Sequence, residues 1–170
     1  MWLLSVYAFL LLGGYLLLSA LRFGIPGMVS DTYYQLKSYT GSTIISFSKP
    51  CNLSWLFTVI MLSVSILMMI CLLDSDKGIQ CLAFIGCAGL AFVGVAPNYC
   101  DKDVYNVHKT GAIVAAIGCV GWCLSVDILP TLIIVLIYIL SLLKINVKHP
   151  WYWLEIVGFL DTFLTYWICV

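Results

Sequence analysis

The chain has 170 residues, of which 63% are hydrophobic and 9% are charged, with eight basic and eight acidic side chains. Its mean hydropathy of +1.08 is far above that of a soluble domain, in which about a quarter of the residues carry charge. A net charge of zero provides no basic field for nucleic acid, so the composition excludes a nucleic-acid-binding protein and predicts an integral membrane protein.

Six apolar stretches follow one another along the chain: 2–21, 53–73, 78–96, 110–126, 128–143 and 151–170. Each is close to the ~20 helical residues that cross a ~30 Å hydrocarbon core. Because no Lys or Arg precedes the first stretch, we expect a true span there and not a cleaved secretory signal. We therefore predict an all-α polytopic membrane protein, a six-transmembrane-helix bundle that forms a single domain over residues 1–170.

The basic residues predict the orientation of this bundle. The first, third and fifth loops between the stretches hold Arg22, Lys37, Lys49, Lys102, Lys109, Lys144 and Lys148, whereas the second and fourth hold Lys77 alone. Cytoplasmic loops carry the excess of Lys and Arg, so the odd loops should be cytoplasmic and both termini should lie outside. The expected location is the bacterial inner (cytoplasmic) membrane, with a multi-pass topology.

The longest loop, 22–52, is predicted to be a structured cytoplasmic loop. Gly24-Ile-Pro-Gly is typical of a turn. Ser30 is expected to cap a short helix that carries Tyr33, Tyr34 and Leu36.

Small residues predict which helices pack most closely. They recur at four-residue spacing in two stretches, as Ala83, Cys87 and Ala91 in 78–96 and as Gly111, Ala115, Cys119 and Cys123 in 110–126. Such stripes let helix backbones approach in lipid, so these two helices are the expected packed centre. The stretch 128–143 is bulky and apolar all round and is expected at the rim, facing lipid.

The last stretch carries two carboxyl groups, Glu155 and Asp161, where a charge costs ~2.5–3.5 kcal/mol on insertion scales. On a helical wheel they share one side with Tyr152, Gly158, Thr162, Thr165, Tyr166 and Cys169. The other side holds Trp153, Ile156, Val157, Leu160, Phe163, Leu164, Trp167 and Ile168. We expect the first side to face protein or a cavity and the second to face lipid. Asp161 lies ~15 Å deep and should be protonated or bonded to a hydroxyl, such as that of Tyr7, Tyr15 or Ser65.

Polar residues gather at the predicted cytoplasmic end. His108 opens the stretch 110–126 and shares the face of Ala112 and Ala115, so it should point inward and contact Glu155 directly or through water. The predicted ligand-binding residues are His108, Glu155, Tyr152, Asp161, Ser30 and Tyr33. No cofactor and no metal site are expected, since the chain has only two histidines and zinc sites need about three protein ligands.

Several functions remain open. The leading hypothesis is a non-enzymatic ligand-, lipid- or partner-binding module whose polar pocket faces the cytoplasm. Its expected partners are membrane lipids, a second copy of the chain or another membrane protein. One alternative is a membrane-embedded metal-dependent hydrolase that uses the candidate catalytic residues His108, Glu155, Asp31 and Asp103. Others are nucleophilic catalysis by Ser30 with Asp31 and His108, an oligomeric channel or transporter, and a purely structural pairing of Glu155 with His108 or Lys148.

Four blocks of sequence resemble a family of small, uncharacterised six-span membrane proteins of bacterial and phage genomes. They are Gly24-Ile-Pro-Gly-Met-Val-Ser-Asp-Thr-Tyr-Tyr, the small-residue run that begins Gln80-Cys-Leu-Ala-Phe-Ile-Gly-Cys, Val107-His108 ahead of an Ala-rich helix with Trp122, and Trp153-Leu-Glu-Ile-Val-Gly-Phe. The resemblance implies a shared six-span scaffold and carries no activity. A histidine heading a small-residue helix is also remotely similar to Frag1/DRAM-like and ceramidase-like proteins, although this chain lacks the extra metal-binding histidines of the latter.

Overall fold

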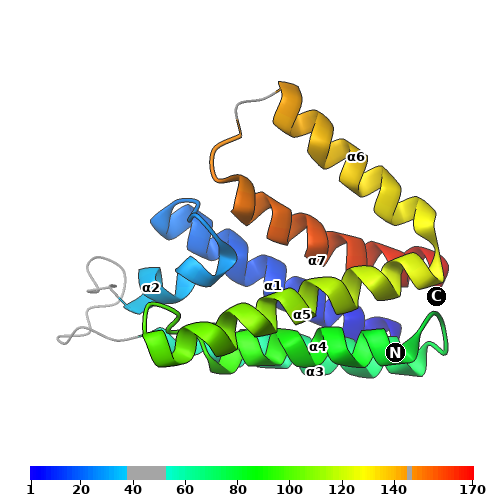
Figure 1. The fold of residues 1–170 in the computed structure, drawn as a ribbon, viewed down its shortest axis with the longest axis horizontal. Helices are drawn as coiled ribbons and strands as arrows, with labels where there is room; N and C mark the ends of the chain where they lie inside the picture. Colours follow the sequence, from blue (N-terminus) through cyan, green and yellow to red (C-terminus); the bar gives the residue numbers. More distant parts are fainter. Residues whose placement is uncertain (38–52, 145–146) are drawn as a thin grey trace.

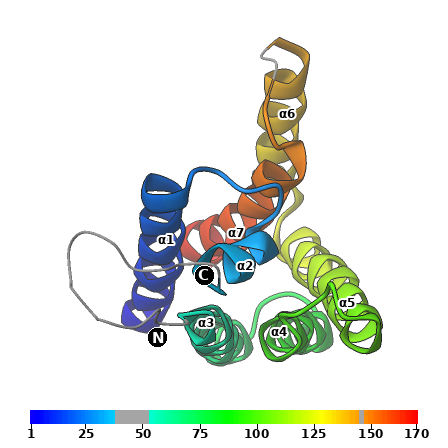
Figure 2. The same ribbon diagram turned by 90° about the vertical axis from the view of Figure 1, so that its left-hand side faces the viewer.

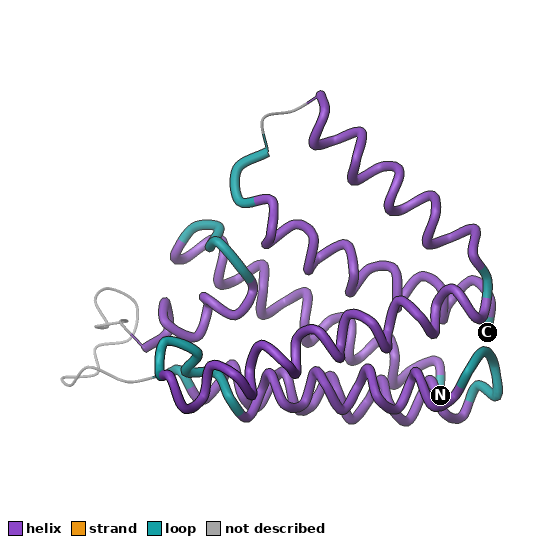
Figure 3. The backbone as a smooth tube through the Cα atoms, viewed as in Figure 1, coloured by secondary structure: helices purple, strands orange, loops and turns teal. Residues whose placement is uncertain are grey.

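The computed structural model describes residues 1–37, 53–144 and 147–170, and the elements that it describes are all helical (Figures 1 and 3). They are α1 (Trp2–Phe23), a 3₁₀ turn η1 (Val29–Asp31), α2 (Thr32–Lys37), α3 (Trp55–Asp74), α4 (Gln80–Val95), α5 (Lys102–Val126), α6 (Ile128–Lys144) and α7 (Pro150–Cys169). The predicted all-α fold is confirmed for these ranges. The predicted structured loop 22–52 is helical over η1 and α2, and its remainder from residue 38 lies outside the described residues.

Three of these helices, α1, α3 and α5, are long and apolar enough to cross a membrane. The apolar helices α4 and α6 are shorter. The 20-residue α7 is not among the three, because it carries two carboxyl groups and many Trp, Tyr and Thr residues. The described helices are thus compatible with a membrane protein, and the count of six spans stays a prediction.

Helix α5 begins earlier than the hydropathy pattern indicated, at Lys102 and not at residue 110. Asp101 caps it, since its carboxylate accepts a hydrogen bond from the backbone N–H of Asp103 at 3.1 Å. The first two turns of α5 are polar, so hydropathy alone could not detect them. Only a capping argument would have placed the true start.

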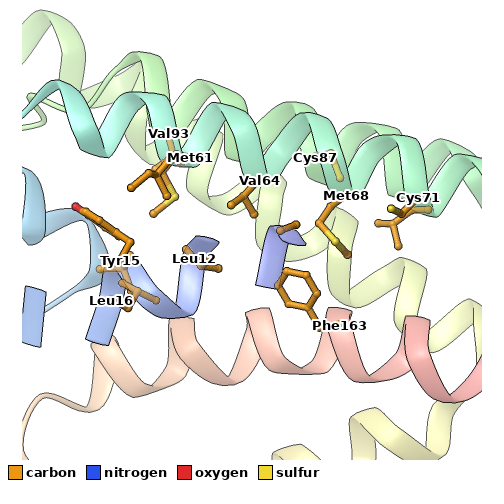
Figure 4. Close-up of a cluster of buried hydrophobic side chains, with 14 of the residues drawn as sticks. Leu12, Tyr15, Leu16, Met61, Val64, Met68, Cys71, Cys87, Val93 and Phe163 are labelled. Carbon is orange, nitrogen blue, oxygen red and sulfur yellow. The ribbon is translucent and has the colours of Figure 1, made fainter. Parts of the chain in front are cut away.

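Seen end-on, α3, α4 and α5 form a row, α1 and α7 lie over it, and α6 is outermost (Figure 2). The hydrophobic core lies between the row and its cover: Leu12 of α1 and Phe163 of α7 face Val64 and Met68 of α3 (Figure 4). Each of these four side chains is buried. Buried residues of α4 and α5, such as Cys87 and Trp122, belong to the same cluster, so the core extends from the row of helices to its cover.

Helices α4 and α5 have the most extensive contact of any helix pair in the described residues, in agreement with the expected packed centre. Glycines make the contact possible: a Cβ on Gly89 would lie 2.4 Å from the backbone N of Ala115, and one on Gly118 would lie 2.4 Å from the backbone N of Gly86. The predicted close pair of helices is right, and Ala115 and Cys119 lie on the seam. The glycines of this seam, Gly86, Gly89 and Gly118, were missed.

Helix α6 leans away from the bundle and packs mainly on α5 and α7 (Figure 1). Its bulky side chains, such as Leu132, Leu136 and Leu140, are exposed. This is the predicted position of the stretch 128–143 at the rim.

Candidate functional site

Helix α7 turns its polar side inward, as the helical wheel predicts. Asp161, Thr162, Thr165 and Tyr166 are buried. The assignment of Phe163 to the lipid side was wrong: it is buried, and its ring lies 5.4 Å from that of Phe9. The buried surface of α7 is wider than its polar stripe, because α1 covers it from one side.

Asp161 obtains a hydroxyl partner, but not one of those expected. The Thr131 hydroxyl lies 3.1 and 3.0 Å from the two carboxyl oxygens, and that of Thr165 lies 3.5 Å away. The expected partners are engaged elsewhere or remote: Ser65 donates to the Cys87 carbonyl, Tyr15 donates to Thr32, and Tyr7 is 58% exposed. Asp161 is therefore a structural link between α6 and α7.

The two side chains expected to contact each other, His108 and Glu155, instead hold consecutive residues of η1. Glu155 Oε2 accepts the backbone N–H of Val29 at 2.6 Å, and His108 Nε2 lies 3.0 Å from the Ser30 hydroxyl. We call these two contacts the η1 clamp. It attaches the segment that follows α1 to α7 and to α5.

The tautomer of His108 follows from its second contact. Nδ1 lies 2.8 Å from the Ala96 carbonyl oxygen, which can only accept, so Nδ1 carries the proton. In the neutral imidazole Nε2 is then the acceptor for the Ser30 hydroxyl. Since Ala96 ends α4, His108 connects the end of α4 to η1. Both His108 and Ser30 are buried.

Asp31 binds the loop between α4 and α5. Its Oδ2 accepts the backbone N–H of Met28 at 2.8 Å, and its Oδ1 accepts the Tyr99 hydroxyl. Burial, followed by this bond to a carboxylate, raises the pKa of the Tyr99 hydroxyl. The Tyr99 ring also lies 5.1 Å from the His108 ring, so the loop closes over the η1 clamp.

Two further contacts, from α2 and from α1, hold the α4–α5 loop and η1 in place. Tyr34 Oη accepts the Cys100 backbone N–H at 2.8 Å. Tyr15 Oη of α1 donates to Thr32 Oγ1 at 2.7 Å, and Thr32 Oγ1 donates to the Val29 carbonyl at 2.7 Å. These hydroxyl and backbone groups are thus satisfied by contacts within the chain itself.

The remaining predicted residues lie beside this cluster or outside it. Tyr152 is buried with its ring 5.5 Å from that of Trp153, and Tyr33 packs its ring 5.1 Å from that of Tyr34. Asp103 is exposed in the first turn of α5. Ser30 does not cap α2, because it lies in η1 and its hydroxyl faces His108.

Sequence reasoning missed Tyr99 and Thr32. The only signal was positional: Tyr99 precedes the Asp101 cap and Thr32 follows Asp31, so both belong to the end of the bundle where His108 lies.

Among the residues that the structure describes, no group of three or more His, Cys, Asp or Glu side chains could hold a metal ion. The described residues therefore offer no set of metal ligands for the metal-dependent hydrolase alternative. No family model, no curated protein and no solved structure matches this chain. The resemblance to small six-span membrane proteins stays a prediction from its motifs.

Proposed function

We propose that this chain is a non-enzymatic binding module of a membrane, with six spans, both termini outside and the η1 clamp at the cytoplasmic end. The bacterial inner membrane is the proposed location. One observation carries the non-enzymatic part: His108 and Glu155 make their hydrogen bonds to consecutive residues of η1. A general acid or base must instead be within reach of a substrate proton. Ligands, lipids or other membrane proteins would bind elsewhere on the helices, because the polar groups of the η1 clamp are already bonded to the chain itself.

A second candidate is acyl transfer, favoured by a single distance. Ser30 Oγ and His108 Nε2 lie 3.0 Å apart, the spacing of a serine nucleophile and its base. An oxyanion would need backbone N–H donors beside Ser30, but the N–H of Val29 is already bonded to Glu155. The arrangement supports a clamp better than a catalytic dyad.

Labelling with a fluorophosphonate probe separates these two functions. We expect no adduct on Ser30 in the purified, lipid-reconstituted protein, and the same labelling pattern in Ser30→Ala. We also expect native mass spectrometry of the unlabelled protein to show a noncovalently retained molecule. An adduct mapped to Ser30 and lost in both Ser30→Ala and His108→Gln would overturn the non-enzymatic proposal.

A pore is less well supported. Ion pathways are lined by polar groups along their length, and the polar side of α7 is buried against the chain itself. A single subunit thus offers little polar lining to an ion.

A further inference from the structure

An apolar groove lies between α6 and α7, on the side of α7 away from the η1 clamp. Its walls include Ile134 and Ile137 of α6 and Trp153, Val157, Leu160 and Leu164 of α7. The α7 residues recur at i, i+4, i+7 and i+11, so they form one stripe of that helix. The groove encloses about 550 Å³, within the ~300–1,000 Å³ of small-molecule sites.

The groove is a wedge with two fixed ends. At the narrow end, Thr131 of α6 contacts Asp161 of α7 at 3.0 Å. At the wide end, the Tyr138 hydroxyl of α6 donates to the Pro150 carbonyl at 2.8 Å. Figure 1 shows α6 and α7 close together where α6 begins and further apart where α6 ends. Because both ends are hydrogen-bonded, the gap is part of the folded structure.

The length of the groove matches one leaflet of a bilayer. Trp153 and Leu164 are 11 residues apart on α7 (164 − 153), which is about 17 Å at the α-helical rise. Half of the hydrocarbon core is about 15 Å. A single acyl chain reaches this far from the interface, whereas a helix of a partner protein would run through the whole core.

Charge and aromatic groups lie at the wide end. Lys148 lines the groove there and is exposed to solvent. Tyr138 and Trp153 lie beside it, as aromatic residues do at the level of lipid head groups. Basic pockets between membrane helices bind anionic head groups, so the wide end suits a phosphate and the walls suit a hydrocarbon tail.

We propose that the α6–α7 groove binds one anionic phospholipid, with an acyl chain between the two helices and its phosphate paired with Lys148. This inference rests on the membrane-embedded binding module proposed above and names its ligand. The groove shares no residue with the η1 clamp, although Ile25 of the segment that the clamp holds also lines it. The two proposals have different readouts and can fail independently.

Native mass spectrometry of protein taken from nanodiscs tests the inference, with an equal mixture of phosphatidylglycerol and phosphatidylcholine as the probe. The wild type should retain one phosphatidylglycerol per chain in preference to phosphatidylcholine. Lys148→Gln should lower that preference about fivefold, the effect of one cation near a membrane surface. Lys77→Gln, a neutralised exposed lysine that does not line the groove, should retain lipid as the wild type does.

Filling the groove should abolish retention. Leu160 is 37% exposed, and Leu160→Trp places a larger ring in the wedge; Ile137→Trp fills it from the α6 side. Leu136→Trp is the matched control, because Leu136 is exposed on α6 and does not line the groove. If one of the two filled variants does not fold, lipid retention by the other tests the inference.

The inference would be overturned by equal retention of phosphatidylglycerol in a folded, filled variant, or by no preference for the anionic lipid in the wild type. It would also be overturned by a dimer that Leu160→Trp dissociates, because a second copy would then be the occupant. A different retained molecule outside the groove would refute this inference and leave the binding module standing. An adduct on Ser30 would refute the non-enzymatic function and leave the groove result standing.

Discussion

The seam between α4 and α5 and the wedge between α6 and α7 are two opposite solutions to helix packing in an apolar chain. In the seam, glycines bring backbones together, so that a Cβ on Gly89 would lie only 2.4 Å from the Ala115 backbone N. In the wedge, bulky side chains such as Ile137 and Leu160 line an open groove of about 550 Å³. Since lipid supplies no hydrophobic drive between helices, the size of the interfacial residues decides which pair closes and which pair stays open.

The largest predicted effect comes from forcing the seam apart. Gly118→Leu should lower the free energy of unfolding by about 3 kcal/mol or more, at the upper end of overpacking effects, because its Cβ would lie 2.4 Å from the Gly86 backbone N. Equilibrium unfolding in mixed micelles, followed by tryptophan fluorescence, measures this. The control is Gly13→Ala in α1, where no neighbouring atom lies within 4 Å, and it should stabilise by up to about 1 kcal/mol.

Removal of the Glu155 carboxylate should have the next largest effect. Glu155→Ala leaves the Val29 N–H without its acceptor, which should cost about 2 kcal/mol, the scale for a buried donor left without a partner. Hydrogen exchange should speed up over residues 25–37 and stay unchanged in α4. Glu155→Gln retains an acceptor oxygen and should lose less than half as much; equal loss in both variants would refute the η1 clamp.

Loss of the Thr131 hydroxyl should loosen the narrow end of the wedge. Thr131→Val removes the contact to Asp161 and should cost about 1 kcal/mol, the scale of interhelical hydrogen bonds in membranes. Thr131→Ser keeps the hydroxyl and serves as the control in the same unfolding assay. If valine proves as stable as serine, Asp161 does not depend on Thr131.

The smallest effect concerns alkaline pH. Burial, followed by the contact with Cys100, raises the pKa of Tyr34 from its ordinary value of 10.0 to about 12. The folded state therefore holds this proton more firmly than the unfolded chain does, and the resulting stabilisation is complete below pH 10 and lost as the pH rises through 12. Absorbance titration at tyrosinate wavelengths should show one fewer high-pH ionisation in Tyr34→Phe, and an unchanged curve would contradict the assignment.

The sequence carries enough information for the helices and for the inward side of α7. Hydropathy locates the apolar part of each long helix, and the period of Asp161, Thr162 and Thr165 places them on the buried side. These signals depend only on neighbours along the chain. For the same reason the exposed rim position of α6 follows from its uniformly bulky side chains.

The η1 clamp, unlike the helices, depends on contacts between residues that are far apart in the chain. Glu155 and Val29 are 126 residues apart in the chain, and Ser30 and His108 are 78 apart, so no local pattern relates them. The sequence predicted that His108 and Glu155 lie at one end of the bundle, but the predicted contact was between these two side chains. The structure places a turn of the chain's own backbone between them. The partner of Asp161 was also missed. Thr131 lies on α6, a helix that was expected to be purely apolar, so no polar contact was sought there.

Labelling of native cysteines with a membrane-impermeant maleimide tests the central claim, a multi-span protein with its polar end in the cytoplasm. Cys100 is exposed beside the η1 clamp, and Cys81 is exposed near the start of α4. We expect Cys100 to be protected in spheroplasts and labelled in inverted membrane vesicles, and Cys81 to show the reverse, as read by peptide mass mapping. Labelling of Cys100 in intact spheroplasts, or equal labelling of both cysteines from both sides, would contradict it.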